Sequence, residues 1–197
     1  MQQFKYLGSV QQPLGCLQAE LTRHLALAGA AFAAMSPRYL CDCRLPLHTR
    51  MAAYKAVVIS TLLYGAAESW APTADQLARL NTFNNRCLRS MLGLRRDQHF
   101  SNEDLWAVTR QPSITAQLQL WRLRWLGHTA RQPLSSREHQ ILFARHVPGH
   151  QTRAGQAPTW VAAAAADVAA KGMQAGLRVD GWHELAQQKE AWKARTA

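Results

Sequence analysis

The feature that most constrains the fold is the regular apolar spacing between Thr73 and Gly93. Thr73 and Gln76 form a Thr-x-x-Gln capping pattern that opens a helix, and glycine is the residue type that most often follows a helix end. Apolar side chains recur between them every three or four residues, at Leu77, Leu80, Phe83, Cys87, Leu88 and Met91. This period matches one side of an α-helix and differs from the period of two that marks a half-buried strand. A helix that opens at Thr73 and closes at Gly93 is therefore predicted.

The same periodicity, together with capping residues and helix breakers, predicts helices over most of the chain. They are expected from Cys16 to Met35, Leu47 to Gly65, Ser101 to Pro112, Ser113 through the tryptophan-rich stretch near 125, Ser135 to about His146, Thr159 to Lys171, and Gly181 to Ala194. One short strand is expected over FKYLGSV, because aromatic and β-branched residues are frequent there.

The predicted fold class is mainly α, a multi-helix bundle with one short N-terminal strand and a small C-terminal helical unit. We expect four segments: the strand in 1–15, a helical domain in 16–93, a helical connector in 94–134, and a C-terminal helical unit in 135–197. The C-terminal unit is expected to contain a loop at 148–158, where glycine, proline and polar residues gather.

The chain is strongly basic, with 23 Lys and Arg against 12 Asp and Glu and a formal net charge of +11. Such a charge concentrates polyanions around the molecule, so nucleic acid is the leading partner class. Arg79, Arg86 and Arg89 fall within an arc of roughly 80° on the helix that opens at Thr73, and such a row can follow a phosphate backbone. Arg95 and Arg96 follow directly after that helix. The alternative interpretation of these arginines is a solubilising surface.

The stretch WRLRWLGHTAR interleaves arginines with two tryptophans. We expect Trp121 and Trp125 to pack in a core, because burial is the usual state of tryptophan. Gly127 and His128 are expected to end the helix. The basic residues of this stretch that are candidates for nucleic-acid contact are Arg122, Arg124 and Arg131. A solvated or salt-bridged face is the alternative for them.

Other functional classes find little support in the residues. No run of 18 apolar residues occurs, and the N-terminus lacks a signal-peptide core, so an intracellular location, nuclear or cytoplasmic, is expected. Cys41, Cys43 and His48 leave a zinc site open, although a Cys-x-Cys pair lacks the usual spacing and a fourth ligand is not evident. No cofactor, resident metal or small-molecule substrate is expected.

Five ordered motifs resemble the region after the catalytic palm in non-LTR retrotransposon reverse transcriptases. They are FKYLGS at 4–9, YKAVVISTLLYGAAESW at 54–70, RCLRSMLGL at 86–94, FSNEDL at 100–105 and RLRWLGHTAR at 122–131. The resemblance implies a last palm strand in 1–15 and a thumb-like helical domain in 16–93. It also implies that Lys5 and Tyr6 lie near a primer backbone. The tail departs from the family pattern, since GQAPTW and AQQKEAW have lost basic and acidic positions.

The resemblance implies a fragment that holds template and primer beside a palm supplied in cis or in trans. Nucleotide polymerisation needs paired aspartates that hold two magnesium ions. The six aspartates, at 42, 75, 97, 104, 167 and 180, are never adjacent, so no polymerase activity is expected from this chain alone. Two rival interpretations are a stand-alone basic helical module that binds RNA or DNA, and an inert relic of a retroelement.

Overall fold

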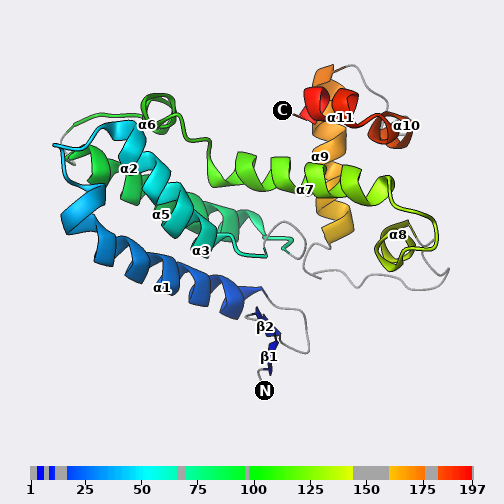
Figure 1. Ribbon diagram of the computed structural model, residues 1–197, viewed down its shortest axis with the longest axis horizontal. Helices are drawn as coiled ribbons and strands as arrows, with labels where there is room; N and C mark the ends of the chain where they lie inside the picture. Colours follow the sequence, from blue (N-terminus) through cyan, green and yellow to red (C-terminus); the bar gives the residue numbers. More distant parts are fainter. Residues whose placement is uncertain are drawn as a thin grey trace. The chain divides into compact units, whose positions relative to one another are not determined.

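The chain is described here from a computed structural model, which describes residues 4–6, 9–11, 17–65, 70–95, 98–143, 160–175 and 182–196. Helices dominate these residues, so the prediction of a mainly α protein is confirmed (Figure 1). The described helices include none that is both long enough and apolar enough to cross a membrane. The chain divides into two compact units. Unit 1 contains Met1–Ala66 and Pro72–Gln117, and unit 2 contains Ala67–Ala71 and Leu118–Ala197.

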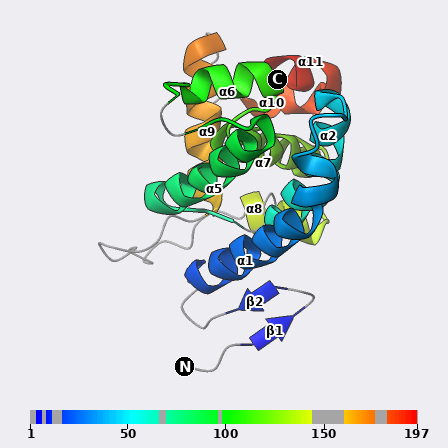
Figure 2. The same cartoon turned by 90° about the vertical axis from the view of Figure 1, so that its left-hand side faces the viewer.

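The prediction of a single N-terminal strand is wrong. Two three-residue strands, β1 (Phe4–Tyr6) and β2 (Ser9–Gln11), pair antiparallel with Lys5 opposite Val10. The sequence separates two β-prone triplets by only two residues, which is the spacing of a hairpin rather than of one continuous strand. Figure 2 shows this hairpin beside the first helix, which β2 contacts.

The residues of unit 1 that the structure describes form seven complete helical segments. They are α1 (Gln18–Met35), the π-helix η1 (Ser36–Leu40), α2 (Leu47–Ala53), the π-helix η2 (Tyr54–Ile59), α3 (Ser60–Leu62), α5 (Ala74–Leu92) and α6 (Asn102–Thr109). The helix expected from Leu47 to Gly65 thus runs to Leu62, with a π-helical centre. Pro37 is the second residue after the end of α1, and the segment that contains it adopts π-helical geometry. Periodicity alone did not predict either π segment.

Both ends of α5 follow the prediction. The Thr73 hydroxyl accepts a hydrogen bond from the Gln76 backbone at 3.4 Å, and the Thr73 backbone donates to the Gln76 side chain at 3.0 Å. Gly93 closes the helix with φ of 68°, a left-handed conformation that glycine adopts without steric cost. The cap of α6 is confirmed as well, because the Ser101 hydroxyl accepts from the Asp104 backbone at 3.0 Å.

Three asparagines on one side of α5 fix the helix against its neighbours. Asn81 accepts from the Ile114 backbone, Asn84 from the Tyr54 hydroxyl and Asn85 from the Trp106 indole, each at 2.9 Å. Burial raises the pKa of Tyr54 far above its ordinary value, which keeps this hydroxyl a neutral donor. At 100° per residue the asparagines lie on the side of α5 away from Arg79 and Arg86, while Arg89 lies within about 40° of Asn85. The polar anchors therefore turn Arg79 and Arg86 away from the core.

A buried arginine holds the far end of α5. Arg50 of α2 donates from Nη1 to the carbonyl oxygens of Met91 at 2.6 Å and Leu40 at 3.3 Å. These carbonyls lie at the C-terminal ends of α5 and η1, where a cation satisfies groups that have no partner within the helix. The buried apolar side chains of unit 1 include Leu21, Ala28, Met51, Tyr54, Val58, Leu62, Leu80, Leu88 and Leu105.

Unit 2 is built around the C-terminal helices and most of α7 (Ile114–Ala130), whose first four residues belong to unit 1. The other helices are α8 (Arg137–Phe143), α9 (Trp160–Ala175), α10 (Trp182–Gln187) and α11 (Lys189–Thr196). Its core consists of Leu123, Leu126, Ala130, Ala164, Val168, Ala186 and Trp192. The compact units therefore differ from the expected segments, whose boundaries lay at 15, 93 and 134.

Two predictions of helix limits in unit 2 need correction. The cap of α8 is Ser136 and not Ser135, since the Ser136 hydroxyl accepts from the His139 backbone at 3.1 Å. The single helix expected from Gly181 to Ala194 is two helices that meet at Gln188. The loop expected at 148–158 lies outside the described residues.

Candidate nucleic-acid interface

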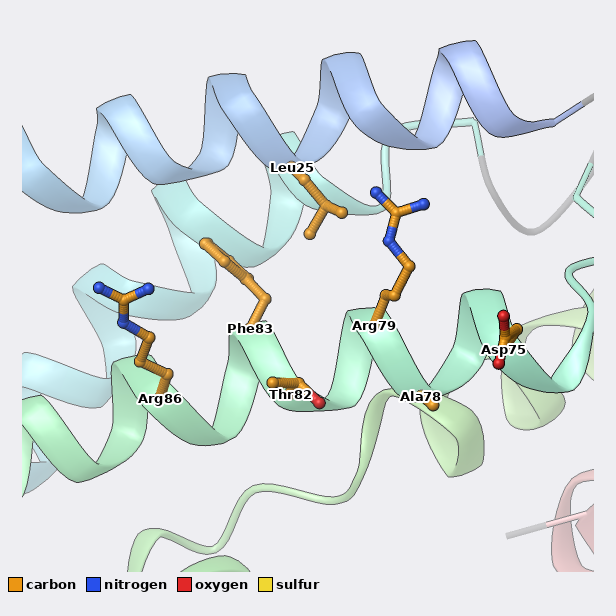
Figure 3. A pocket seen from close by; sticks show the side chains of 7 residues that line it. All are labelled: Leu25, Asp75, Ala78, Arg79, Thr82, Phe83 and Arg86. Carbon is orange, nitrogen blue, oxygen red and sulfur yellow. The ribbon is translucent and has the colours of Figure 1, made fainter. Parts of the chain in front are cut away.

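Two of the predicted arginines border one groove between α1 and α5. The groove encloses about 460 Å³ and is lined by Leu25, Asp75, Ala78, Arg79, Thr82, Phe83 and Arg86. Figure 3 shows the side chains of Arg79, Phe83 and Arg86 rising from α5 toward α1, with Leu25 descending between them from α1. The groove therefore has an apolar centre with a guanidinium group toward either end.

Arg79 and Arg86 are free to meet an external anion. Arg86 is exposed and Arg79 is half-buried. Within the described residues, neither guanidinium group takes part in an ion pair or a hydrogen bond. The two positions are seven residues apart, which corresponds to about 10.5 Å along a helix axis. Two arginines of the predicted row, Arg79 and Arg86, therefore border the groove.

Arg89 does not extend this pair as predicted. Its Nη2 atom donates to the carbonyl oxygen of Phe100 at 3.0 Å and to the Asn102 side chain at 2.9 Å. These contacts tie α5 to the start of α6, so the guanidinium group already has protein acceptors. Arg95 is exposed, and Arg96 lies outside the described residues.

Arg122 is a core residue rather than a contact for nucleic acid. Its Nε atom donates to Asp167 Oδ2 at 2.7 Å, and both side chains are only 6% exposed. The salt-bridged alternative is therefore the correct one for this arginine. Burial of an arginine at this position depends on a carboxylate 45 residues away, which helical periodicity does not reveal.

The two other arginines of the WRLRWLGHTAR stretch, Arg131 and Arg124, lie in different environments. Arg131 donates from Nη1 to the carbonyl oxygen of Ala186 at 2.7 Å, which ties the end of α7 to α10. Arg124 is exposed and forms no contact with the described residues that would occupy its guanidinium group. Trp125 and Trp160 meet edge to face with ring centroids 4.9 Å apart, while Trp121 and Trp125 are half-buried and are not among the core residues of unit 2. Of the three arginines of this stretch, Arg124 is the one whose guanidinium group has no acceptor among the described residues.

Gly127 and His128 do not end α7 as predicted, because the helix continues to Ala130. Gly127 instead lies against the indole of Trp192, whose Nε1 donates to the carbonyl oxygen of Leu123 at 2.9 Å. A glycine inside a helical pattern often reflects close packing, so the sequence carried this signal. Lys5 and Tyr6 lie in β1 and are not among the residues that line the groove between α1 and α5.

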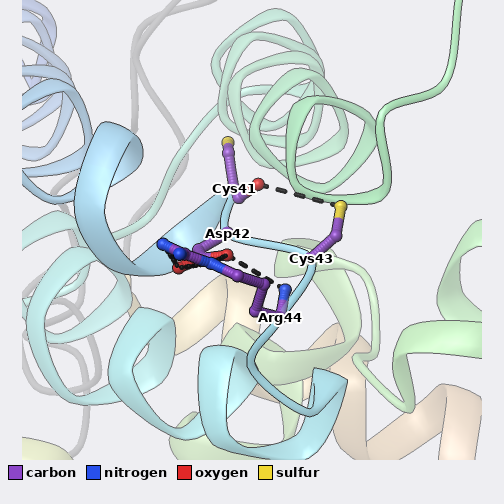
Figure 4. Close-up of polar contacts among 4 residues, drawn as sticks. All are labelled: Cys41, Asp42, Cys43 and Arg44. Carbon is purple, nitrogen blue, oxygen red and sulfur yellow. Dashed lines mark hydrogen bonds and ion pairs between the residues drawn. The ribbon is translucent and has the colours of Figure 1, made fainter.

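The zinc alternative finds no support in the described residues, which contain no group of three or more His, Cys, Asp or Glu side chains able to hold a metal ion. The Cys41 sulfur lies 3.0 Å from the Ser36 hydroxyl, and Cys43 donates to the Cys41 carbonyl oxygen at 3.9 Å. Figure 4 shows these two cysteines with the adjacent ion pair of Asp42 and Arg44. The Arg44 side chain, as a hydrogen-bond donor, holds the pKa of the half-buried Asp42 carboxyl below its ordinary value.

The cysteines of unit 1 should differ sharply in reactivity. Burial raises the pKa of Cys87 to about 11, whereas Cys43 is exposed. Only a small fraction of Cys87 is then thiolate at pH 8, and the thiolate is the reactive form. We expect a maleimide reagent at pH 8 to label Cys43 rapidly and Cys87 only after urea unfolding, as read by peptide mass spectrometry. Equal labelling of both in the folded protein would contradict this burial.

We compared the chain with models of known protein families, with curated proteins and with solved structures, and no match was found.

Proposed function

We propose that this chain binds nucleic acid through its phosphate backbone, with Arg79 and Arg86 of α5 as the principal contacts. The proposed biological setting is the thumb and C-terminal region of a non-LTR retrotransposon reverse transcriptase, which holds template and primer. The observation that carries the proposal is the pair of arginines on one side of a doubly capped helix, neither of which forms a hydrogen bond or ion pair with the residues that the structure describes. Guanidinium groups of this kind match phosphate geometry, and the net charge of +11 attracts a polyanion.

The salt dependence of binding tests this proposal. Each phosphate that a protein neutralises contributes about 0.9 to the slope of log K against log salt for B-DNA. Replacing Arg79 and Arg86 together by alanine should therefore reduce the magnitude of the slope by about 2. The measurement is fluorescence anisotropy of a labelled RNA–DNA duplex between 50 and 300 mM salt, chosen as roughly the range in which such slopes are resolved.

A matched control separates local contact from overall charge. Arg38 and Lys55 are exposed in unit 1 and do not line the groove, so their double alanine variant removes the same charge. Its slope should stay close to that of the unchanged chain. Equal slopes for both double variants would reduce the arginine pair to a general surface charge and would refute the proposal.

The rival interpretation, a stand-alone basic helical module, uses the same contacts without a polymerase. The pair of Arg79 and Arg86 favours it as much as the retrotransposon setting. The coding sequence upstream of the Met1 codon distinguishes the two. An in-frame palm with adjacent aspartates supports the retrotransposon setting, and a stop codon without such a region supports the module.

A further inference from the structure

We infer that the groove between α1 and α5 takes one unpaired base, whose flanking phosphates lie on Arg79 and Arg86. This inference rests on the proposed function and deepens it, because it names the part of a nucleic acid that the site recognises. It predicts that the protein prefers a duplex with a single-stranded extension over a blunt duplex.

The apolar centre of the groove is the first step. Contact with a phosphate backbone alone requires cations on a polar surface, but here Leu25 and Phe83 lie between the two arginines (Figure 3). Both side chains are only half-buried, so part of their apolar surface faces the groove. Phosphates and sugars would leave this apolar surface exposed to water. The face of a base covers it, since aromatic side chains stack on bases of any sequence.

The size and composition of the groove favour a base over a protein helix. A volume of about 460 Å³ falls in the range of small-ligand sites. A helix bound in a groove places apolar anchors at four positions over two turns, whereas this groove offers two large apolar side chains, Leu25 and Phe83, and the methyl group of Ala78. One planar group between two anions fits this composition better than a helix does.

The charges around the groove also determine the side on which a bound strand leaves it. Asp75 lies beyond Arg79, in the first turn of α5, and is exposed. Its carboxylate repels a further phosphate on that side. At the other end, Arg86 is exposed and Arg95 follows α5, so the positive charge continues. The bound strand therefore leaves the groove past Arg86.

The experiment compares a blunt 12-base-pair RNA–DNA duplex with the same duplex carrying a three-nucleotide extension, about the shortest that reaches past one stacked base. We expect the extended duplex to bind at least about fivefold more tightly, the lower end of the contribution from one stacked base. Phe83→Leu keeps the apolar volume near Gly29 but removes the aromatic face. It should abolish the preference, so that this variant binds the extended and the blunt duplex with equal affinity.

A second measurement uses the unchanged chain, so it does not depend on the folding of a variant. An extension that carries 5-iodouracil is irradiated in the complex, and cross-linked peptides are identified by mass spectrometry. A cross-link at Phe83 is expected, because this base analogue reacts with an aromatic ring on which it stacks.

The failures of the two proposals are distinguishable. Equal affinity for blunt and extended duplexes, or a cross-link only outside the groove, overturns the base-binding inference and leaves backbone binding intact. Absence of binding to every oligonucleotide overturns both. Saturation of the groove by a glutamate-rich amphipathic peptide, with no competition from oligonucleotides, likewise overturns both and identifies a protein ligand.

Discussion

Replacing Arg122 by alanine will destabilise unit 2 by about 3–5 kcal/mol, because it leaves a buried carboxylate without its cation. Asp167 is 5% exposed and accepts from Arg122 Nε at 2.7 Å. Water cannot replace the guanidinium group at such a site without opening the packing of α7 against α9. The expected loss appears in urea unfolding followed by tryptophan fluorescence, since Trp125, Trp160 and Trp192 all lie in unit 2.

The control for this prediction lies two residues further along the same helix. Arg124 is exposed, so Arg124→Ala should change the free energy of unfolding by less than about 0.5 kcal/mol. A double variant with Arg122→Met and Asp167→Leu should regain most of the stability, since apolar pairs often replace a buried ion pair at little cost. A loss below about 1 kcal/mol in Arg122→Ala would contradict a buried, paired state.

This pair also shows where prediction from sequence reaches its limit. The periodicity of α7 placed Arg122 on the helix and near two tryptophans, and it left open whether the side chain meets solvent, a salt bridge or nucleic acid. Only tertiary packing brings Asp167 to it. Local patterns identify a helix and its ends, but the environment of a long polar side chain depends on a partner far along the chain.

Unit 1 gives the converse case. The caps of α5 at Thr73 and Gly93 involve contacts within one turn of the helix, and the sequence predicted them correctly. The positions of Arg79 and Arg86 on one side of α5 also follow from local sequence. The groove could not be predicted in this way, because Leu25 comes from α1 and lies near these arginines only in the folded unit. Phe83 was predicted to lie on the apolar side of this helix, and only the structure shows that it lines the groove.

Gly127→Ala will destabilise unit 2, with an expected loss of about 2–3 kcal/mol from overpacking. A methyl group at this position would lie 2.5 Å from Cδ1 and 2.8 Å from Cε2 of the Trp192 indole. The indole cannot move away cheaply, because Trp192 is 4% exposed and its Nε1 donates to the Leu123 carbonyl oxygen at 2.9 Å. α7 and α11 must therefore separate. The measurement is urea unfolding followed by circular dichroism.

Gly29→Ala is the matched control, since it adds the same methyl group inside another helix. That methyl would meet Phe83 Cε2 at 3.8 Å, an ordinary contact, so the higher helix propensity of alanine should stabilise unit 1 by about 0.5–1 kcal/mol. Trp192→Phe supplies the remaining test. If the indole causes the loss, Gly127→Ala will lower the free energy of unfolding by clearly less in the Trp192→Phe background than in the unchanged chain. Such a difference is the coupling that a double-mutant cycle measures between contacting residues. An equal cost in both backgrounds would assign the loss to the helix backbone and not to the packing of Trp192.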